Sequence, residues 1–193
     1  VSDRAYAGGW WDWLSVFSIL TGVAVVVGYA LLGATWLILK TENTLQRRMQ
    51  SYAWYLGAGT LVFIGVVSIL TPFQDPEYFQ RWLNLPGSIF SVIMPGAVLA
   101  AGWALFTGLN GGKDAQPFLA TRSIFVLCFI GIGISFYPNI IPPTLTIAEA
   151  AAPDKSLLFA LVGTVVLVPM ILAYTAYAYW VFRGKIDPAE GYH

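Results

Sequence analysis

The sequence predicts an all-α membrane protein in which about five transmembrane helices form an antiparallel bundle, with a periplasmic N-terminus and a cytoplasmic C-terminus. Two features of the composition support this: 58% of the 193 residues are hydrophobic and only 10% are charged. Soluble globular domains carry about 25% charged residues. The third feature is that the apolar residues form long unbroken runs, which is typical of helices that cross a bilayer.

Five windows meet the requirement of about 20 apolar residues for a membrane-crossing helix. In chain order they are Trp13–Leu39, Tyr52–Leu70, Ile89–Leu109, Phe118–Tyr137 and Leu157–Phe182, within a single helical domain of residues 1–193. The first and last windows are longer than required, so we expect them to tilt or to extend into the interface. The fourth window contains Arg122 near its start, and the long arginine stem can reach the headgroups if that end is interfacial.

The loop charges predict the orientation of the chain. One side of the membrane holds seven basic residues, which are Lys40, Arg47, Arg48, Lys113, Arg122, Arg183 and Lys185. The other side holds three, which are Arg4, Arg81 and Lys155. Because Lys and Arg are enriched in cytoplasmic loops, the first side is expected to be cytoplasmic. The ten acidic and ten basic residues cancel overall, so nothing suggests a nucleic-acid partner.

The links between the windows differ on the two sides. The predicted cytoplasmic links, Lys40–Ser51 and Asn110–Pro117, are short and mostly polar, so the helices that they join should pack as antiparallel neighbours. The outer links, Thr71–Ser88 and Pro138–Ser156, are longer and rich in proline. Each is expected to lie along the outer surface as a bent segment or a short interfacial helix.

The spans offer little catalytic chemistry, since none of the ten acidic residues lies within a window. His193, the only histidine, is the last residue, and we do not expect it to bind a metal. Met94 and Met170 are possible axial ligands of a haem, but flexible packing beside Pro95 and Pro169 is the favoured interpretation. Cys128 is expected to be a small buried hydrophobic residue. The sequence therefore assigns no catalytic, cofactor-binding or metal-binding residue.

Small and aromatic residues in the spans indicate packing. Glycines such as Gly28 and Gly57 permit the close backbone approach on which membrane helices rely. Pro95 and Pro169 should kink their helices. The bends could line a cavity or a gate, or they could simply let neighbouring helices fit together, and we favour the second interpretation. A groove for a lipid or a quinone could use aromatic side chains at these depths, although packing is the commoner role; the candidates are Tyr29, Trp36, Trp103, Tyr174 and Tyr177.

Three stretches carry a family resemblance. They are Gly28–Glu42 (GYALLGATWLILKTE), Ser135–Pro143 (SFYPNIIPP) and Val166–Ile186 (VLVPMILAYTAYAYWVFRGKI). In order and spacing they resemble the C-terminal half of subunit II of the cytochrome bd-type quinol oxidases, including the cyanide-insensitive branch. The resemblance extends over nearly the whole sequence, and it carries no catalytic role onto any residue here.

The resemblance implies a multi-pass subunit in a bacterial inner membrane. Haems b and d would be held by a partner, the haem-bearing subunit I, and this chain would be a haem-free companion that supports assembly and stability of the quinol oxidase. Membrane lipids, and quinone as a further candidate, would be its small-molecule contacts. The alternative from the residues themselves is one half of a small helical transporter or channel, since transporters use interrupted helices near the midplane.

Overall fold

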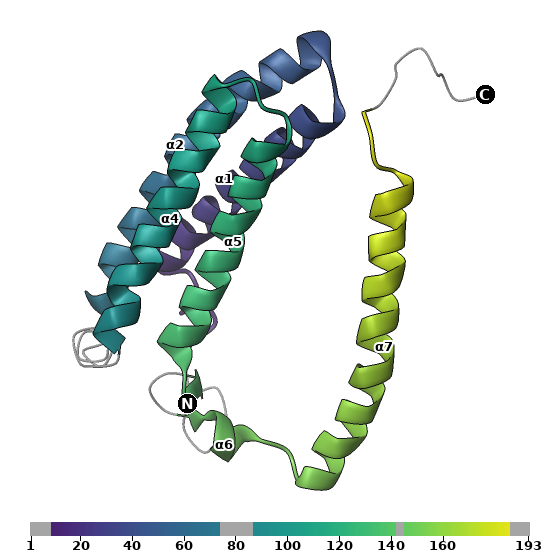
Figure 1. Cartoon of the computed structure of the whole chain (residues 1–193). Coiled ribbons are helices and arrows are strands. Elements are labelled where there is room, and N and C mark those ends of the chain that lie inside the picture. Colours follow the sequence, from purple (N-terminus) through teal and green to yellow (C-terminus); the bar gives the residue numbers. More distant parts are fainter. Residues whose placement is uncertain (1–8, 74–86, 142–144, 186–193) are drawn as a thin grey trace.

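The computed structural model describes residues 9–73, 87–141 and 145–185, which form mainly long helices (Figure 1). The elements in chain order are helices α1 (Val16–Lys40) and α2 (Asn43–Leu70), a 3-10 turn η1 (Thr71–Phe73), helices α4 (Gly87–Asn110) and α5 (Ala115–Phe136), strands β1 (Asn139–Ile141) and β2 (Leu145–Thr146), and helices α6 (Ile147–Ala150) and α7 (Asp154–Val181).

Five helices are long and apolar enough to cross a membrane, which confirms the predicted number of spans. The largest difference is at α2, which begins at Asn43 and not at Tyr52. The added residues are polar, so hydropathy alone misses them, although they continue the helix. The other helix ends lie within about one turn of the predicted ones.

Four of the long helices form a bundle, and the fifth stands apart from it. The antiparallel pairs α1–α2 and α4–α5 pack together, α1 contacts α5, and α2 contacts α4. Figure 1 shows α7 on the far side of a wide separation from this four-helix bundle. No residue of α7 is buried, and its large apolar side chains are between 44% and 84% exposed. The sequence predicted an antiparallel bundle of all five helices, and the structure adds that α7 leaves the others over most of its length.

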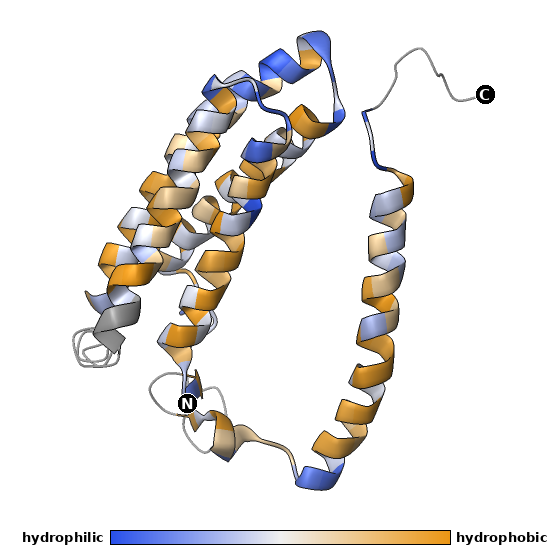
Figure 2. Cartoon of the chain, viewed as in Figure 1, coloured by the Kyte–Doolittle hydropathy of each residue, from blue (hydrophilic) through white to orange (hydrophobic). Residues whose placement is uncertain are grey.

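The bundle core lies toward the end where the two short links are found. Its buried residues are Leu31, Ala34, Ile38, Ala53, Leu105, Leu109 and Ala120. Glycine permits close approach at the contact between α2 and α4, because a Cβ added at Gly57 would lie 3.0 Å from Leu105 and one at Gly102 would lie 2.7 Å from Leu61. Elsewhere many large apolar side chains are exposed. Figure 2 shows that hydrophobic residues make up much of the length of the helices.

The second outer link contains a short helix, as the sequence predicts. Strands β1 and β2 pair antiparallel, and α6 follows directly. A capping box fixes the start of α6, because Thr146 Oγ1 accepts from the amide of Glu149 while the Glu149 carboxylate accepts from the amide of Thr146. Of the first outer link, the structure describes η1 and the start of α4, and residues 74–86 lie outside the described part.

Candidate functional site

The residues that the sequence singled out as possible ligands do not converge. Met94 on α4 is half-buried, Met170 on α7 is 60% exposed, and Cys128 on α5 is partly buried. His193 lies outside the described residues. Among the residues that the structure does describe, no group of three or more His, Cys, Asp or Glu side chains could hold a metal ion.

The five candidate aromatic residues are spread over three helices. Tyr29 packs edge-on against Phe125, with ring centroids 5.4 Å apart. Trp103, Tyr174 and Tyr177 are more than 60% exposed. No ring contact within the described part of the chain joins two of the five. None of them lines the groove between α1 and α2 or the one between α4 and α5.

Trp36 has a different role, because it is the point where α7 meets the bundle. Its ring lies 5.1 Å from that of Phe118 on α5 and 5.8 Å from that of Tyr179 on α7, measured between centroids. The ammonium of Lys40 lies 5.1 Å from the centroid of the same ring. A cation over an indole face is attracted by the negative face of the ring. Three helices thus share one aromatic contact near the short links.

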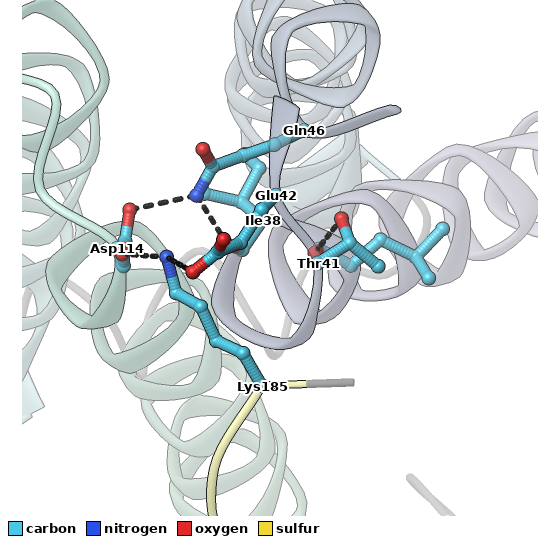
Figure 3. A network of polar contacts seen from close by, with 7 residues as sticks. Ile38, Thr41, Glu42, Gln46, Asp114 and Lys185 are labelled. Carbon is cyan, nitrogen blue, oxygen red and sulfur yellow. Dashed lines mark hydrogen bonds and ion pairs between the residues drawn. The ribbon is translucent and has the colours of Figure 1, made fainter. Parts of the chain in front are cut away.

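A set of polar residues next to Trp36 forms the best-defined site in the chain. It joins the end of α1, both short links and the segment after α7, and we call it the loop–tail cluster: Lys40, Glu42, Gln46, Asp114 and Lys185. Figure 3 shows Glu42, Gln46, Asp114 and Lys185. Lys40 Nζ donates to the carbonyl oxygens of Phe182, at 2.6 Å, and Gly184, at 3.1 Å. These carbonyls follow the last turn of α7, where intrahelical partners are lacking.

Lys185 is the central cation of the cluster. Its Nζ lies 2.6 Å from Asp114 Oδ2 and 3.5 Å from Glu42 Oε1. The Lys185 and Asp114 side chains are about one-third exposed, whereas that of Glu42 is 57% exposed. The hydrogen bond from Lys185 to Asp114 raises the pKa of the Lys185 ammonium, and the charges of Asp114 and Glu42 act in the same direction. Lys185 therefore stays charged at any physiological pH.

Gln46 completes the cluster from the side of α2. Its Nε2 donates to Asp114 Oδ1, at 2.8 Å, and to the carbonyl oxygen of Ile38, at 3.0 Å. Asp114 therefore accepts at both carboxylate oxygens, from Gln46 and from Lys185. Figure 3 shows these side chains pointing toward one another from separate segments. The arrangement fastens the C-terminal end of α7 to both links.

The sequence predicts that these charged residues lie on one side of the membrane, but it does not predict which of them form ion pairs. The pairing explains why the end of α1, both links and the end of α7 meet, as the alternation of five spans requires. The sequence did contain a signal for such pairing, because Glu42 and Asp114 lie among the basic residues of that side. The cluster holds the end of α1, both links and the segment after α7 together.

Comparison with known proteins is consistent with this arrangement. The family described as Cytochrome bd terminal oxidase subunit II matches residues 1–182. Cytochrome bd ubiquinol oxidase subunit 2 of Bacillus subtilis (strain 168) is 26% identical over 186 residues, covering 93% of this chain and 53% of that protein. Cytochrome bd-I ubiquinol oxidase subunit 2 of Escherichia coli (strain K12) is 25% identical over 218 residues, covering 96% and 56%.

The chain spans about half the length of these relatives. The family match nevertheless extends over nearly all of the present sequence, and it agrees with the five apolar helices of a multi-pass protein of the bacterial inner membrane. The chain belongs to the cytochrome bd terminal oxidase subunit II family.

Proposed function

We propose that this chain acts as a haem-free membrane subunit, corresponding to the C-terminal part of subunit II, in a cytochrome bd-type quinol:oxygen oxidoreductase. It supports the assembly and stability of the haem-bearing subunit I in aerobic respiration and does not itself carry out the redox reaction. Haems b and d belong to the partner subunit in this proposal.

The observation that carries the proposal is the chemistry of the spans. The five apolar windows of the sequence contain no histidine and no acidic residue. A proximal histidine is a common ligand of haem iron, and a methionine often serves as its partner. Proton transfer through a membrane relies on chains of ionisable side chains. A chain of this composition depends on a neighbour for both tasks.

The exposure of α7 further supports a role in assembly. This helix is apolar around its whole circumference, and the rest of the chain covers none of its residues. The loop–tail cluster holds its C-terminal end in place while its length stays open. A helix held in this way offers an apolar surface that a neighbouring membrane subunit can cover.

Absorption spectra test the proposal. The chain is expressed alone and together with the haem-bearing subunit of the same bacterium, and each preparation is purified through a tag on this chain. We expect no haem bands from the chain alone, and haem bands with oxygen consumption only when the larger subunit copurifies. Stoichiometric haem, or oxygen consumption, in the chain alone would refute the proposal.

The transporter alternative has its own readout. It predicts flux of a neutral solute into liposomes that contain this chain alone. The oxidase proposal predicts no flux above that of protein-free liposomes. The groove between α1 and α2 and the one between α4 and α5 do not favour the transporter, because neither is lined by the five candidate aromatic residues or by the two span prolines.

A further inference from the structure

A hollow lies on the bundle surface between α4 and α5. It encloses about 700 Å³ and we call it the α4–α5 groove. Ala101 and Ala104 from α4, with Leu119 and Ala120 from α5, form its floor, and Lys113 from the link between the helices stands at its mouth. The hollow exists because the short side chains of the alanines cannot fill the space between the two helices.

Most polar groups that line the groove already have partners. The amide of Gln116 donates to the carbonyl oxygen of Ala104, at 2.8 Å, and to the hydroxyl of Thr107, at 3.1 Å. The hydroxyl of Ser123 donates to the carbonyl oxygen of Leu119, at 2.9 Å. These groups are satisfied within the protein and have little left to offer a ligand.

The acidic group at the mouth is neutralised by the loop–tail cluster. Asp114 pairs with Lys185 through one carboxylate oxygen and accepts from Gln46 through the other. The charge of Asp114 is thus compensated from outside the groove. Lys113 is exposed, and no ion pair or hydrogen bond engages its ammonium within the described residues. The mouth of the groove therefore has an uncommitted positive charge.

A second cation lies beside the groove within the membrane-spanning part of α5. Arg122 is adjacent in sequence to the lining residue Ser123 and is exposed, and no residue in the described ranges pairs with its guanidinium. It lies seven residues after the first residue of α5, or about 10 Å along the helix axis. Helix side chains lean toward the helix N-terminus, which here is the end that carries Lys113. Arg122 can therefore reach the headgroup level on the same side.

We propose that the α4–α5 groove binds one anionic phospholipid. An acyl chain lies over Ala101, Ala104 and Leu119, and the phosphate lies between Lys113 and Arg122. The volume falls within the range of about 300–1,000 Å³ that is common for ligand sites in proteins. This inference depends on the membrane location of the chain and not on its proposed part in the oxidase.

A groove between α1 and α2 provides an internal comparison. It encloses about 470 Å³ and is lined by Gly33, Ala34, Tyr52 and neighbouring apolar residues, with no charged side chain. The two grooves share a position in an antiparallel helix pair, but only the α4–α5 groove of these two has a cation at its mouth. A charge-selective site is therefore expected in the α4–α5 groove alone.

Native mass spectrometry of the full chain tests the site. The protein is reconstituted in vesicles of equal parts phosphatidylglycerol and phosphatidylcholine, extracted in detergent, and its retained lipid is identified. We expect one phosphatidylglycerol per chain. A cation near the surface of an anionic membrane contributes roughly a fivefold gain in binding, so the double variant Lys113→Gln, Arg122→Gln should retain about 25-fold less. The control Arg47→Gln, Arg48→Gln removes the same charge from the N-terminal part of α2 and should retain the lipid.

The variant Ala101→Leu tests the floor, since it fills the groove without changing a charge, and it should also release the lipid. If Ala101→Leu fails to fold, the single variant Lys113→Gln, in a link, provides the decisive measurement. Four results would overturn the proposal: equal retention of phosphatidylcholine, equal loss in the control variant, no lipid on the parent chain, or a cross-link from Ser123→Cys to a protein helix that occupies the groove.

Discussion

Gly57 and Gly102 illustrate how single residues decide the packing of this bundle. Both lie where α2 and α4 approach each other, and a Cβ at either position would meet a leucine of the facing helix. The sequence analysis identified Gly57 as a packing residue but did not single out Gly102. A Cβ added at Gly28 would lie 3.1 Å from Phe125, whereas Gly22, Gly65, Gly131 and Gly133 have open space around them. Sequence can therefore propose the residue type, but the partner helix decides which glycine matters.

Substitution of Gly102 by valine should destabilise the bundle. The new side chain would overlap with Leu61 and push α2 from α4, and overpacking of this kind typically costs about 1–3 kcal/mol. The measurement is the midpoint of thermal unfolding in detergent. Gly131→Val is the matched control, because nothing lies within 4 Å of a Cβ at Gly131. Equal midpoints for the two variants would contradict the packing argument.

Lys185→Gln should release the tail without unfolding the bundle. The variant removes the cation that joins Asp114 and Glu42, but solvent-screened ion pairs contribute little to global stability. We therefore expect faster hydrogen exchange of the amides of residues 182–185 and a nearly unchanged unfolding midpoint. Lys155→Gln, at the opposite end of α7, should leave this exchange unaltered. Exchange at the parent rate in Lys185→Gln would show that the cluster does not hold the tail.

At the scale of the helix, α7 is attached mainly at one end. The contacts that the structure defines there are the carbonyl bonds to Lys40, the Trp36–Tyr179 ring contact and the ion pairs of Lys185. The five membrane spans could be predicted because a helix needs an apolar run long enough to cross the hydrocarbon core of the bilayer. The separation of α7 from the bundle could not be predicted, because a helix that is apolar on all sides shows no preferred face for packing. The first two turns of α2 were missed because Asn43–Ser51 is polar but still helical.

The attachment of α7 should weaken in strongly alkaline solution. The pKa of Lys185 is raised above its ordinary value of 10.5, so the ion pairs are fully present below that pH and are lost as the pH rises through the higher folded-state pKa. Nitroxide labels at Thr44→Cys and Phe182→Cys, in a Cys128→Ala background, report the distance between the first link and the tail.

That distance should be narrowly distributed at pH 7 and should broaden once the pH exceeds the raised folded-state pKa of Lys185. In the Lys185→Gln variant the distance distribution should be broad at both neutral and alkaline pH. This separates the titration of this lysine from general alkaline damage. A distribution that stays narrow at high pH would mean that the bonds from Lys40 to the tail carbonyls suffice.

At the scale of the whole molecule, the alternation of the links sets the topology. The end of α1, the link between α4 and α5, and the segment after α7 meet in one cluster, so they share a side of the membrane. The sequence could predict this alternation from the distribution of lysine and arginine alone. It could not predict the contacts of the cluster, because Lys40 and its carbonyl partners are separated by more than 140 residues in sequence.

Cysteine labelling tests the orientation. In a Cys128→Ala background, Asn110→Cys in the link between α4 and α5 should react with a membrane-impermeant maleimide only after the cells are opened. Ala151→Cys, just after α6, should react in the periplasm of intact cells. The reverse pattern would invert the topology, and reaction of both residues from one side would contradict the number of spans between them.

The position of Lys185 has a consequence for the order of biosynthesis. A ribosome makes the chain from its N-terminus, so Glu42 and Asp114 leave it well before their shared cation does. Until residue 185 is translated, the two carboxylates stand in the links without that counter-charge, and the last helix has no anchor on them. Closure of the cluster would thus mark a nascent polypeptide that has been translated past α7.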